Sequence, residues 1–335
     1  MLKWLVGGLL ALVGLITLVL VGGYFAMKRA DIPYQTLAAK YESAASRYVD
    51  LPGNIRMHYR DQGTQAAGAP TLLLVHGFSA SLHTWEPWVA RLGDTYRIVT
   101  LDLPGHGLTR APAGYQANIG AYVDAVEAFA RAQNLNRFIL GGSSMGGNVS
   151  WEYALAHPER VEGLILVGAS GWEDTRLAGR DEPTVFKLLR NPVLGPMLRD
   201  LDNTALIRQG LQASFYNPAL VDDAMVARYS ELARAPGHRD ILIQISMGFR
   251  ERDYATPERL APLAQMPVLI LHGDTDRLVP PDHGQHFANA ISGSTLVMYE
   301  NTGHIPQEEM PDRSAADVRA FVDTTRVRAN VASVN

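Results

Sequence analysis

The sequence of 335 residues predicts an α/β protein with a mostly parallel central sheet and helices on both faces. Short apolar runs alternate along the chain with segments in which apolar residues recur every three or four positions, and this alternation is typical of parallel sheets. One interval of about 100 residues interrupts the alternation. An ordinary connection has about 2 to 6 residues, so the interval predicts an inserted helical cap.

The first element is an apolar segment, Trp4–Met27, that contains no charged residue. About 20 apolar residues suffice to cross the hydrocarbon core of a bilayer. A cleaved signal peptide is the alternative, but its apolar region has only about 7 to 15 residues and ends in an A-x-A-like site. We therefore predict an uncleaved transmembrane anchor over residues 1–29. Lys3 lies on one side and Lys28 and Arg29 on the other, so the charge rule does not settle its orientation.

After a polar connector over residues 30–46, the pattern changes to strands. Residues 47–51 and 55–60 alternate apolar and polar positions around a Pro-Gly-Asn turn, which predicts an antiparallel hairpin at the sheet edge. The later strands are nearly continuous apolar runs, as expected for strands buried on both faces. These runs cover residues 71–75, 97–101, 138–140, 164–167, 268–271 and 295–299. The clearest helical stripe between them consists of Ile119, Tyr122, Val123, Val126 and Phe129.

The long interval without strands contains several short helical patterns separated by Pro and Asn. We assign residues 172–264 to the cap, and residues 47–171 together with 265–327 to the core. Residues 328–335 lack apolar periodicity, so we expect a frayed tail.

Composition excludes several functions. Lys and Arg number 30 against 34 Asp and Glu, and no basic block could neutralise a phosphate backbone, so we expect no nucleic-acid partner. The chain has no cysteine, which excludes disulfides, thiolate metal sites, a cysteine nucleophile and lipid attachment through cysteine.

A candidate nucleophile lies where a predicted strand meets a helix-compatible stretch. Gly142-x-Ser144-x-Gly146 directly follows the apolar run over residues 138–140 and directly precedes residues 148–156. A serine at so sharp a turn has a strained backbone, and glycines two positions before and after it avoid collisions. This context predicts Ser144 as a nucleophile at the carboxyl edge of the sheet.

A serine hydroxyl needs a base, and the base needs a carboxylate that fixes its tautomer. We choose His304 because it follows the last predicted strand and precedes the final predicted helix. Asp274 and Asp276 both follow an earlier strand. We prefer Asp276, since Asp274 lies in a tight turn where it can bond the local backbone. The chain order Ser144, Asp276, His304 is found in only one fold among the common triads.

The oxyanion of the reaction would be held by two backbone amides. Met145 directly follows the nucleophile at a helix N-terminus, and Phe78 follows the first central strand. His76 and His106 lie in loops at the same edge and are interpreted as structural or oxyanion-loop residues.

We predict no metal and no cofactor. His283 and His286 have a spacing that suits a metal, but the sequence supplies no convincing third ligand, so we interpret them as part of a solvated helix face.

Together these motifs resemble the α/β-hydrolase superfamily over about residues 48–327. Within it the sequence is similar to bacterial lid-bearing serine carboxylesterases and lipases, in which an insertion after the sixth strand forms a helical cap. The matching motifs, in chain order, are His76-Gly77-Phe78, Asp102-Leu-Pro-Gly-His-Gly107, Gly141-Gly-Ser-Ser-Met-Gly-Gly147, His157-Pro158-Glu159-Arg160, Gly273-Asp-Thr-Asp276 and Gly303-His304.

Departures from related families narrow the choice. Epoxide hydrolases and haloalkane dehalogenases carry an aspartate nucleophile, against which Ser144 argues. Carbon-carbon hydrolases usually continue their oxyanion loop from glycine to a further Gly-Pro, whereas this chain has Phe78-Ser79-Ala80. Many lipases have histidine where this chain has Ser143. Cofactor-free perhydrolases share nearly every motif and stay open as an alternative.

The resemblance and the motifs together predict a carboxylesterase or lipase that acts through an acyl-enzyme on Ser144. We expect a small ester substrate with a hydrophobic acyl group, and a bacterial inner-membrane anchor with the catalytic unit in the periplasm. A carbon-carbon hydrolase or perhydrolase with the same triad is the alternative. A non-catalytic membrane-tethered receptor is a further one, but such proteins tend to lose a triad member.

Overall fold

The computed structural model describes residues 2–177, 184–248 and 253–334. Within these residues eight strands form one sheet in the order β1-β2-β4-β3-β5-β6-β7-β8. The β1–β2 and β2–β4 pairs are antiparallel and the other neighbouring pairs are parallel. The predicted α/β fold, with its antiparallel hairpin at the edge, is confirmed. The strands are β1 Ser46–Leu51, β2 Ile55–Gly63, β3 Thr71–Val75, β4 Arg97–Leu101, β5 Phe138–Ser143, β6 Val161–Val167, β7 Val268–Gly273 and β8 Thr295–Tyr299.

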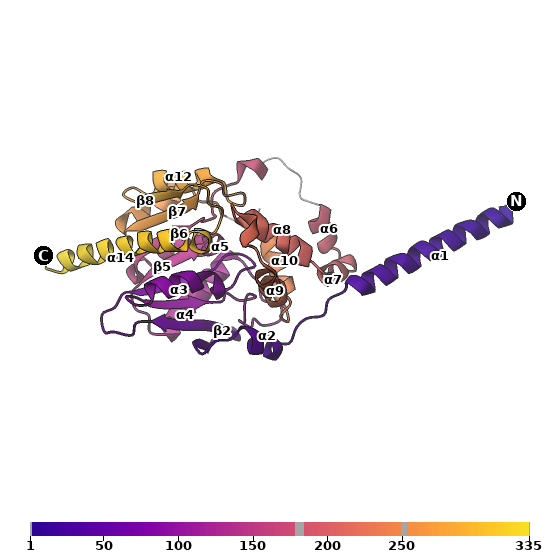
Figure 1. Ribbon diagram of the computed structural model, residues 1–335, viewed down its shortest axis with the longest axis horizontal. Coiled ribbons are helices and arrows are strands. Elements are labelled where there is room, and N and C mark those ends of the chain that lie inside the picture. Colours follow the sequence, from indigo (N-terminus) through magenta and orange to yellow (C-terminus); the bar gives the residue numbers. More distant parts are fainter. Residues whose placement is uncertain (1, 178–183, 249–252, 335) are drawn as a thin grey trace.

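Helices cover both faces of the sheet (Figure 1). Successive residues of a strand point to opposite faces, so Leu73 joins one buried cluster while Leu72 and Leu74 join another. Phe129 of α4 packs in the first cluster, and Trp88 of α3 packs in the second. Burial on both sides explains why the central strands are apolar at nearly every position. The covering helices are α3 Glu86–Leu92, α4 Ile119–Ala132, α5 Met145–Ala156, α12 Pro281–Ala290 and α14 Pro311–Val334.

The chain between β6 and β7 forms the inserted helices that the sequence predicts, and residues 178–183 and 249–252 of the predicted cap lie outside the described residues. Leu211 of α8 and Val226 of α9 pack together with Ile305, which belongs to the loop after β8. The inserted helices therefore lie over the carboxyl ends of the parallel strands. They are α6 Thr184–Leu189, α7 Leu194–Arg199, α8 Thr204–Ser214, α9 Asp223–Leu232, α10 His238–Gly248 and α11 Pro257–Leu260.

The N-terminal helix α1, Leu2–Met27, projects away from the rest of the molecule (Figure 1). Among the described residues, Trp4–Met27 is the one helical segment long and apolar enough to cross a membrane, with a mean hydropathy of 2.6. The connector that follows contains α2, Tyr34–Tyr41. Leu37 of α2 is buried against Leu108 and against Leu232 of α9, so the connector packs on the inserted helices.

The last helix extends into the stretch that the sequence assigns to a tail. A frayed tail is expected over residues 328–335, and α14 continues through Val334. No proline or glycine follows Pro311 in this stretch, and its alanines and arginines favour helix, so nothing in the sequence ends the helix where its apolar stripe ends.

Candidate active site

Ser144 occupies the sharp turn between β5 and α5. Its backbone angles, φ 55° and ψ −117°, are strained for a residue with a side chain. Hydrogen bonds on both sides hold the turn. The Ser144 N–H donates to Val167 at 2.9 Å, and its carbonyl accepts from the N–H groups of Asn148 and Ser170, both at 3.1 Å. The surrounding backbone therefore fixes the position of the serine.

Two glycines make this turn sterically possible. A Cβ on Gly142 would lie 2.1 Å from the carbonyl oxygen of Gly146, and a Cβ on Gly146 would lie 2.2 Å from that of Val75. Both obstacles are backbone atoms, which cannot rotate away. The sequence predicts glycine at these positions for the same reason, because any side chain would push the turn off the end of β3.

His304 and Asp276 meet at the ends of neighbouring strands. His304 Nδ1 lies 2.7 Å from Asp276 Oδ2, and both side chains are almost fully buried. His304 follows β8 and Asp276 follows β7, so the parallel register brings their loops together. Asp274 instead accepts a longer bond, 3.4 Å, from the backbone N–H of Thr302. The structure therefore places Asp276, the residue chosen from the sequence, against the histidine.

The Asp276 carboxylate is held as an anion. Its Oδ1 accepts from the N–H groups of Leu278 and Val279 at 2.8 and 2.9 Å, and its Oδ2 also lies 3.3 Å from His272 Nε2. Burial by itself would raise the pKa of Asp276, but His304 and His272 together hold that pKa below its usual range. A carboxylate ionised in this way orients an imidazole and stabilises its protonated form.

The loop after β3 closes the other side of Ser144. A Cβ on Gly77 would lie 3.1 Å from the Ser144 Cβ, so the Gly77–Phe78 peptide runs directly beside the nucleophile. Met145, the first residue of α5, is almost fully buried behind it. The two predicted oxyanion donors, the amides of Phe78 and Met145, thus belong to segments that flank Ser144.

The other histidines at this edge have structural partners. His76 Nδ1 lies 2.7 Å from the carbonyl of Gly77, its Nε2 accepts from Leu103 N–H at 3.0 Å, and burial lowers the pKa of His76. His106 is also buried, and burial lowers its pKa well below the ordinary value. These residues shape the loops around the nucleophile.

His283 and His286 stack on each other with ring centroids 5.9 Å apart. Over residues 2–177, 184–248 and 253–334, no group of three or more His, Asp or Glu side chains is placed to hold a metal.

The inserted helices contact the histidine loop directly, which the motifs do not reveal. The His304 N–H donates to the carbonyl of Ser214, the last residue of α8, at 2.7 Å. The Glu309 carboxylate accepts from Gly303 N–H at 2.7 Å and from the N–H groups of Tyr216 and Asn217 at 3.1 and 2.9 Å. Glu309 therefore ties the loop that carries His304 to the segment after α8. No sequence motif predicts the contacts of Ser214 and Glu309, because each of them joins segments that are distant along the chain.

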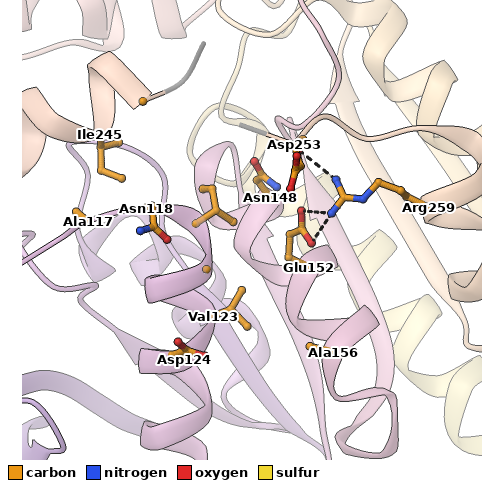
Figure 2. Close-up of a pocket in the computed structure, with 13 residues that line it drawn as sticks. Ala117, Asn118, Val123, Asp124, Asn148, Glu152, Ala156, Ile245, Asp253 and Arg259 are labelled. Carbon is orange, nitrogen blue, oxygen red and sulfur yellow. Dashed lines mark hydrogen bonds and ion pairs between the residues drawn. The ribbon is translucent and has the colours of Figure 1, made fainter. Parts of the chain in front are cut away.

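A cavity of about 560 Å³ opens between α4, α5 and the segment around Arg259 (Figure 2). Asn148, one turn after Ser144 on α5, lines it, and so does Glu152, which accepts from the Arg259 guanidinium at 2.8 Å. Because its wall includes this ion pair, the cavity is more polar than a pocket for the hydrophobic acyl group that the sequence leads us to expect.

The fold agrees with comparisons to known proteins. A model of the α/β-hydrolase fold family matches residues 70–311, and the chain belongs to this family. The chain is 30% identical to a pimeloyl-[acyl-carrier protein] methyl ester esterase from Neisseria meningitidis, over 79% of this chain and 98% of that protein. It is 27% identical to a 2-hydroxymuconate semialdehyde hydrolase from Pseudomonas sp. strain CF600, over 81% and 92%.

Among solved structures, a protein described as a membrane phospholipase A and bacterial virulence factor aligns with a TM-score of 0.70 at 28% identity. The alignment covers 97% of this chain and 99% of that one, and so extends into the N-terminal helix. The relatives therefore support a hydrolase, and they include one named as a methyl ester esterase and one named as a semialdehyde hydrolase.

Proposed function

We propose that this protein is a serine hydrolase of carboxylic esters that is held at a membrane by α1. The observation that carries the proposal is the contact between His304 and Asp276 at 2.7 Å, at the same sheet edge as the strained Ser144. Ser144 Oγ attacks the ester carbonyl, and His304 takes its proton and returns it to the leaving alcohol. Asp276 holds the imidazole in the tautomer that accepts this proton.

The negative charge of the tetrahedral intermediate is stabilised by the backbone N–H groups of Phe78 and Met145. The Met145 N–H belongs to the N-terminus of α5, where the helix dipole favours an anion. Water activated by His304 then releases the acid from the acyl-enzyme. No metal or cofactor is needed for these steps.

The membrane part of the proposal rests on α1. Apart from the half-buried Tyr24, its side chains over Trp4–Met27 are exposed among the described residues, so the fold leaves nearly the whole length of this apolar helix uncovered. A bilayer is the environment that covers such a surface. Retention of the full-length protein in membranes after an alkaline wash, with release of a variant lacking residues 1–27, is the expected result. Protease digestion of intact spheroplasts tests the periplasmic side, and the mass of the mature N-terminus tests cleavage.

The nucleophile is tested by a fluorophosphonate probe on full-length protein in detergent micelles. We expect covalent labelling that Ser144→Ala abolishes. Ser143→Ala is the matched control, because Ser143 is buried and accepts a hydrogen bond from Gln307 at 3.2 Å. Labelling that survives in Ser144→Ala, or folded wild-type protein that is never labelled, contradicts the proposal, and the second result favours the receptor alternative.

The bond that is cleaved is tested with p-nitrophenyl esters of increasing chain length and with triglycerides. The 2-hydroxymuconate semialdehyde hydrolase relative makes carbon-carbon cleavage the main alternative, and peracid formation is the other. If the enzyme cleaves a ring-cleavage dienoate, or forms peracetic acid, faster than it hydrolyses any ester, that reaction becomes the assigned activity. Ser144 would keep its role as nucleophile.

A further inference from the structure

Several exposed apolar side chains lie on or directly beside the first three inserted helices. Val193, just before α7, is 70% exposed, and Leu206 of α8 is 69% exposed. They belong to a set that we call the cap-edge patch: Val185, Leu188, Val193, Leu194, Met197 and Leu206. The patch is not the core of the inserted helices, which is a separate buried cluster around Leu211 and Phe215. Clustered exposed apolar residues commonly mark an interaction surface.

The end of α1 is bonded to the same helices. The Met27 carbonyl accepts from Asp202 N–H at 2.9 Å, between α7 and α8. Lys28 and Arg29 pair with Asp200 and Asp202 at 3.8 and 2.9 Å. Leu206 follows Asp202 by four residues and lies in the first turn of α8. The helices that carry the patch are therefore next to the point at which the N-terminal helix joins the folded body, and Figure 1 shows α6 and α7 at the end from which α1 projects.

A buried arginine fixes this attachment. The Arg239 side chain of α10 is only 10% exposed. It donates to the carbonyls of Arg29 and Arg199 at 2.9 and 3.3 Å and pairs with Asp31 at 2.6 Å. One guanidinium thus holds the last residues of the anchor, the end of α7 and the start of the connector together. The position of the patch relative to α1 is set by these bonds.

The length of α1 sets the depth of the patch. A helix of 24 residues spans about 36 Å at about 1.5 Å per residue, whereas the hydrocarbon core is about 30 Å thick. The last turn of α1 then lies at the level of the lipid headgroups, and so does the patch bonded to it. Apolar side chains can enter a bilayer to about 5–10 Å at this level. Exposed Lys187 of α6 adds a positive charge beside the patch.

We propose that the cap-edge patch docks into the interfacial region of the bilayer in which α1 is anchored. This inference rests on the proposed membrane anchor. Docking would hold the inserted helices, which lie over the strand ends that carry the proposed triad, against the lipid surface. An amphiphilic ester would then reach the site from the membrane.

The test uses the absence of cysteine from the chain, which makes single-cysteine spin labels specific. Full-length Val193→Cys is labelled and reconstituted into vesicles of phosphatidylethanolamine and phosphatidylglycerol. Collision rates are measured with oxygen, which enters lipid, and with a water-soluble nickel chelate. Val327→Cys is the matched control, because Val327 is 63% exposed and belongs to α14, which runs to the end of the molecule opposite α1 (Figure 1).

We expect nickel collisions at position 193 to be several-fold rarer than at position 327, with oxygen collisions retained. Leu206→Cys, an independent position in the patch, should behave like Val193→Cys. Leu12→Cys, in the middle of α1, reports the anchor separately.

Nickel collisions at 193 and 206 equal to those at 327, with a lipid-embedded label at 12, would overturn docking and leave the anchor intact. A water-exposed label at 12 would overturn the anchor and docking together. Dipolar broadening at 193 that disappears on dilution with unlabelled protein would show a second copy of the chain on the patch instead of lipid. None of these readouts depends on Ser144, so a failed esterase assignment is distinguishable from failed docking.

Discussion

The catalytic edge of the sheet and the junction between the anchor and the inserted helices are built from different interactions. At the edge, the backbone groups of Ser144 are all bonded, and the His304 and Asp276 side chains are almost fully buried. At the junction, Lys28 and Lys40 reach their acidic partners with side chains that are 44% and 53% exposed. Exposed ion pairs each contribute only about 0.2 to 1 kcal/mol.

The first region fixes the geometry of the proposed catalytic residues, and the second fixes where the anchor is attached to the folded body. The edge is over-determined, because backbone bonds and close packing at several glycines define one arrangement. The junction depends on many weak contacts and on one buried guanidinium, that of Arg239. Substitutions at the edge should therefore act on the reaction or on folding as a whole, whereas substitutions at the junction should act locally.

The largest expected effect is on the reaction. Asp276→Asn should lower kcat by about 10⁴-fold, because an amide can donate to the imidazole and favour the wrong tautomer. Asp274→Asn is the matched control in the same loop and should change kcat only a few-fold, since Asp274 accepts one long bond from Thr302. Turnover of p-nitrophenyl butyrate by folded variants measures both. Similar losses in the two variants would mean that the proposed triad has the wrong acid.

A glycine-to-alanine substitution should change the stability of the protein in opposite directions at the catalytic edge and in the inserted helices. Gly146→Ala should destabilise the protein by more than about 3 kcal/mol, because the new Cβ meets two backbone carbonyls at 2.2 and 2.4 Å. Gly210→Ala, in α8, should stabilise it by about 0.5 to 1 kcal/mol, because its Cβ meets nothing within 4 Å and alanine favours helix. Thermal unfolding in detergent micelles compares them. A Gly146→Ala variant as stable as the wild type would contradict the packing argument.

Glu308 couples the two regions through pH. Glu308 lies on the short helix α13, Pro306–Glu309, which follows His304 in the chain. Its carboxylate accepts from Thr84 Oγ1 at 2.5 Å and lies close to Arg228 of α9. Burial raises the pKa of Glu308 to about 7, from 4.5. Between these values the folded chain keeps a proton that the unfolded chain releases, so the unfolding free energy falls as pH rises through this window.

Glu308→Gln removes this decline, because glutamine does not ionise and still accepts from Thr84. Relative to wild type, the variant should gain up to about 3 kcal/mol on going from about pH 4 to about pH 8, at about 1.4 kcal/mol per pKa unit. Unfolding midpoints measured across that range give the difference. Parallel curves for the two proteins would show that Glu308 ionises normally in the fold.

The sequence predicts the edge far better than the junction. The turn at Ser144 and the order of the strands follow from local patterns, because a nucleophile at a strand end needs glycines at fixed spacing. The bonds from His304 to Ser214 and from Glu309 to Tyr216 join segments about 90 residues apart. No local pattern encodes such contacts. The apolar pattern gives no end for α14, since helix propensity continues beyond residue 327 after the apolar stripe has ended.

The smallest expected effects test the junction itself. Arg239→Met keeps the aliphatic stem but removes the bonds to Arg29 and Asp31, and it should cost about 2 kcal/mol, as is typical of charged hydrogen bonds. Lys40→Met removes the pair with Glu231 and should cost less than about 1 kcal/mol, because that lysine is half exposed.

Limited proteolysis of the connector over residues 30–46, in full-length protein, is the measurement. Cleavage should accelerate strongly in Arg239→Met and barely in Lys40→Met, while esterase turnover of a water-soluble substrate stays near the wild-type value in both. Equal cleavage rates in the two variants would mean that the exposed ion pairs hold the connector as strongly as the buried guanidinium does. A large loss of turnover in Arg239→Met would mean that the anchor attachment also sets the geometry at Ser144, which the separate bonding of the two regions argues against.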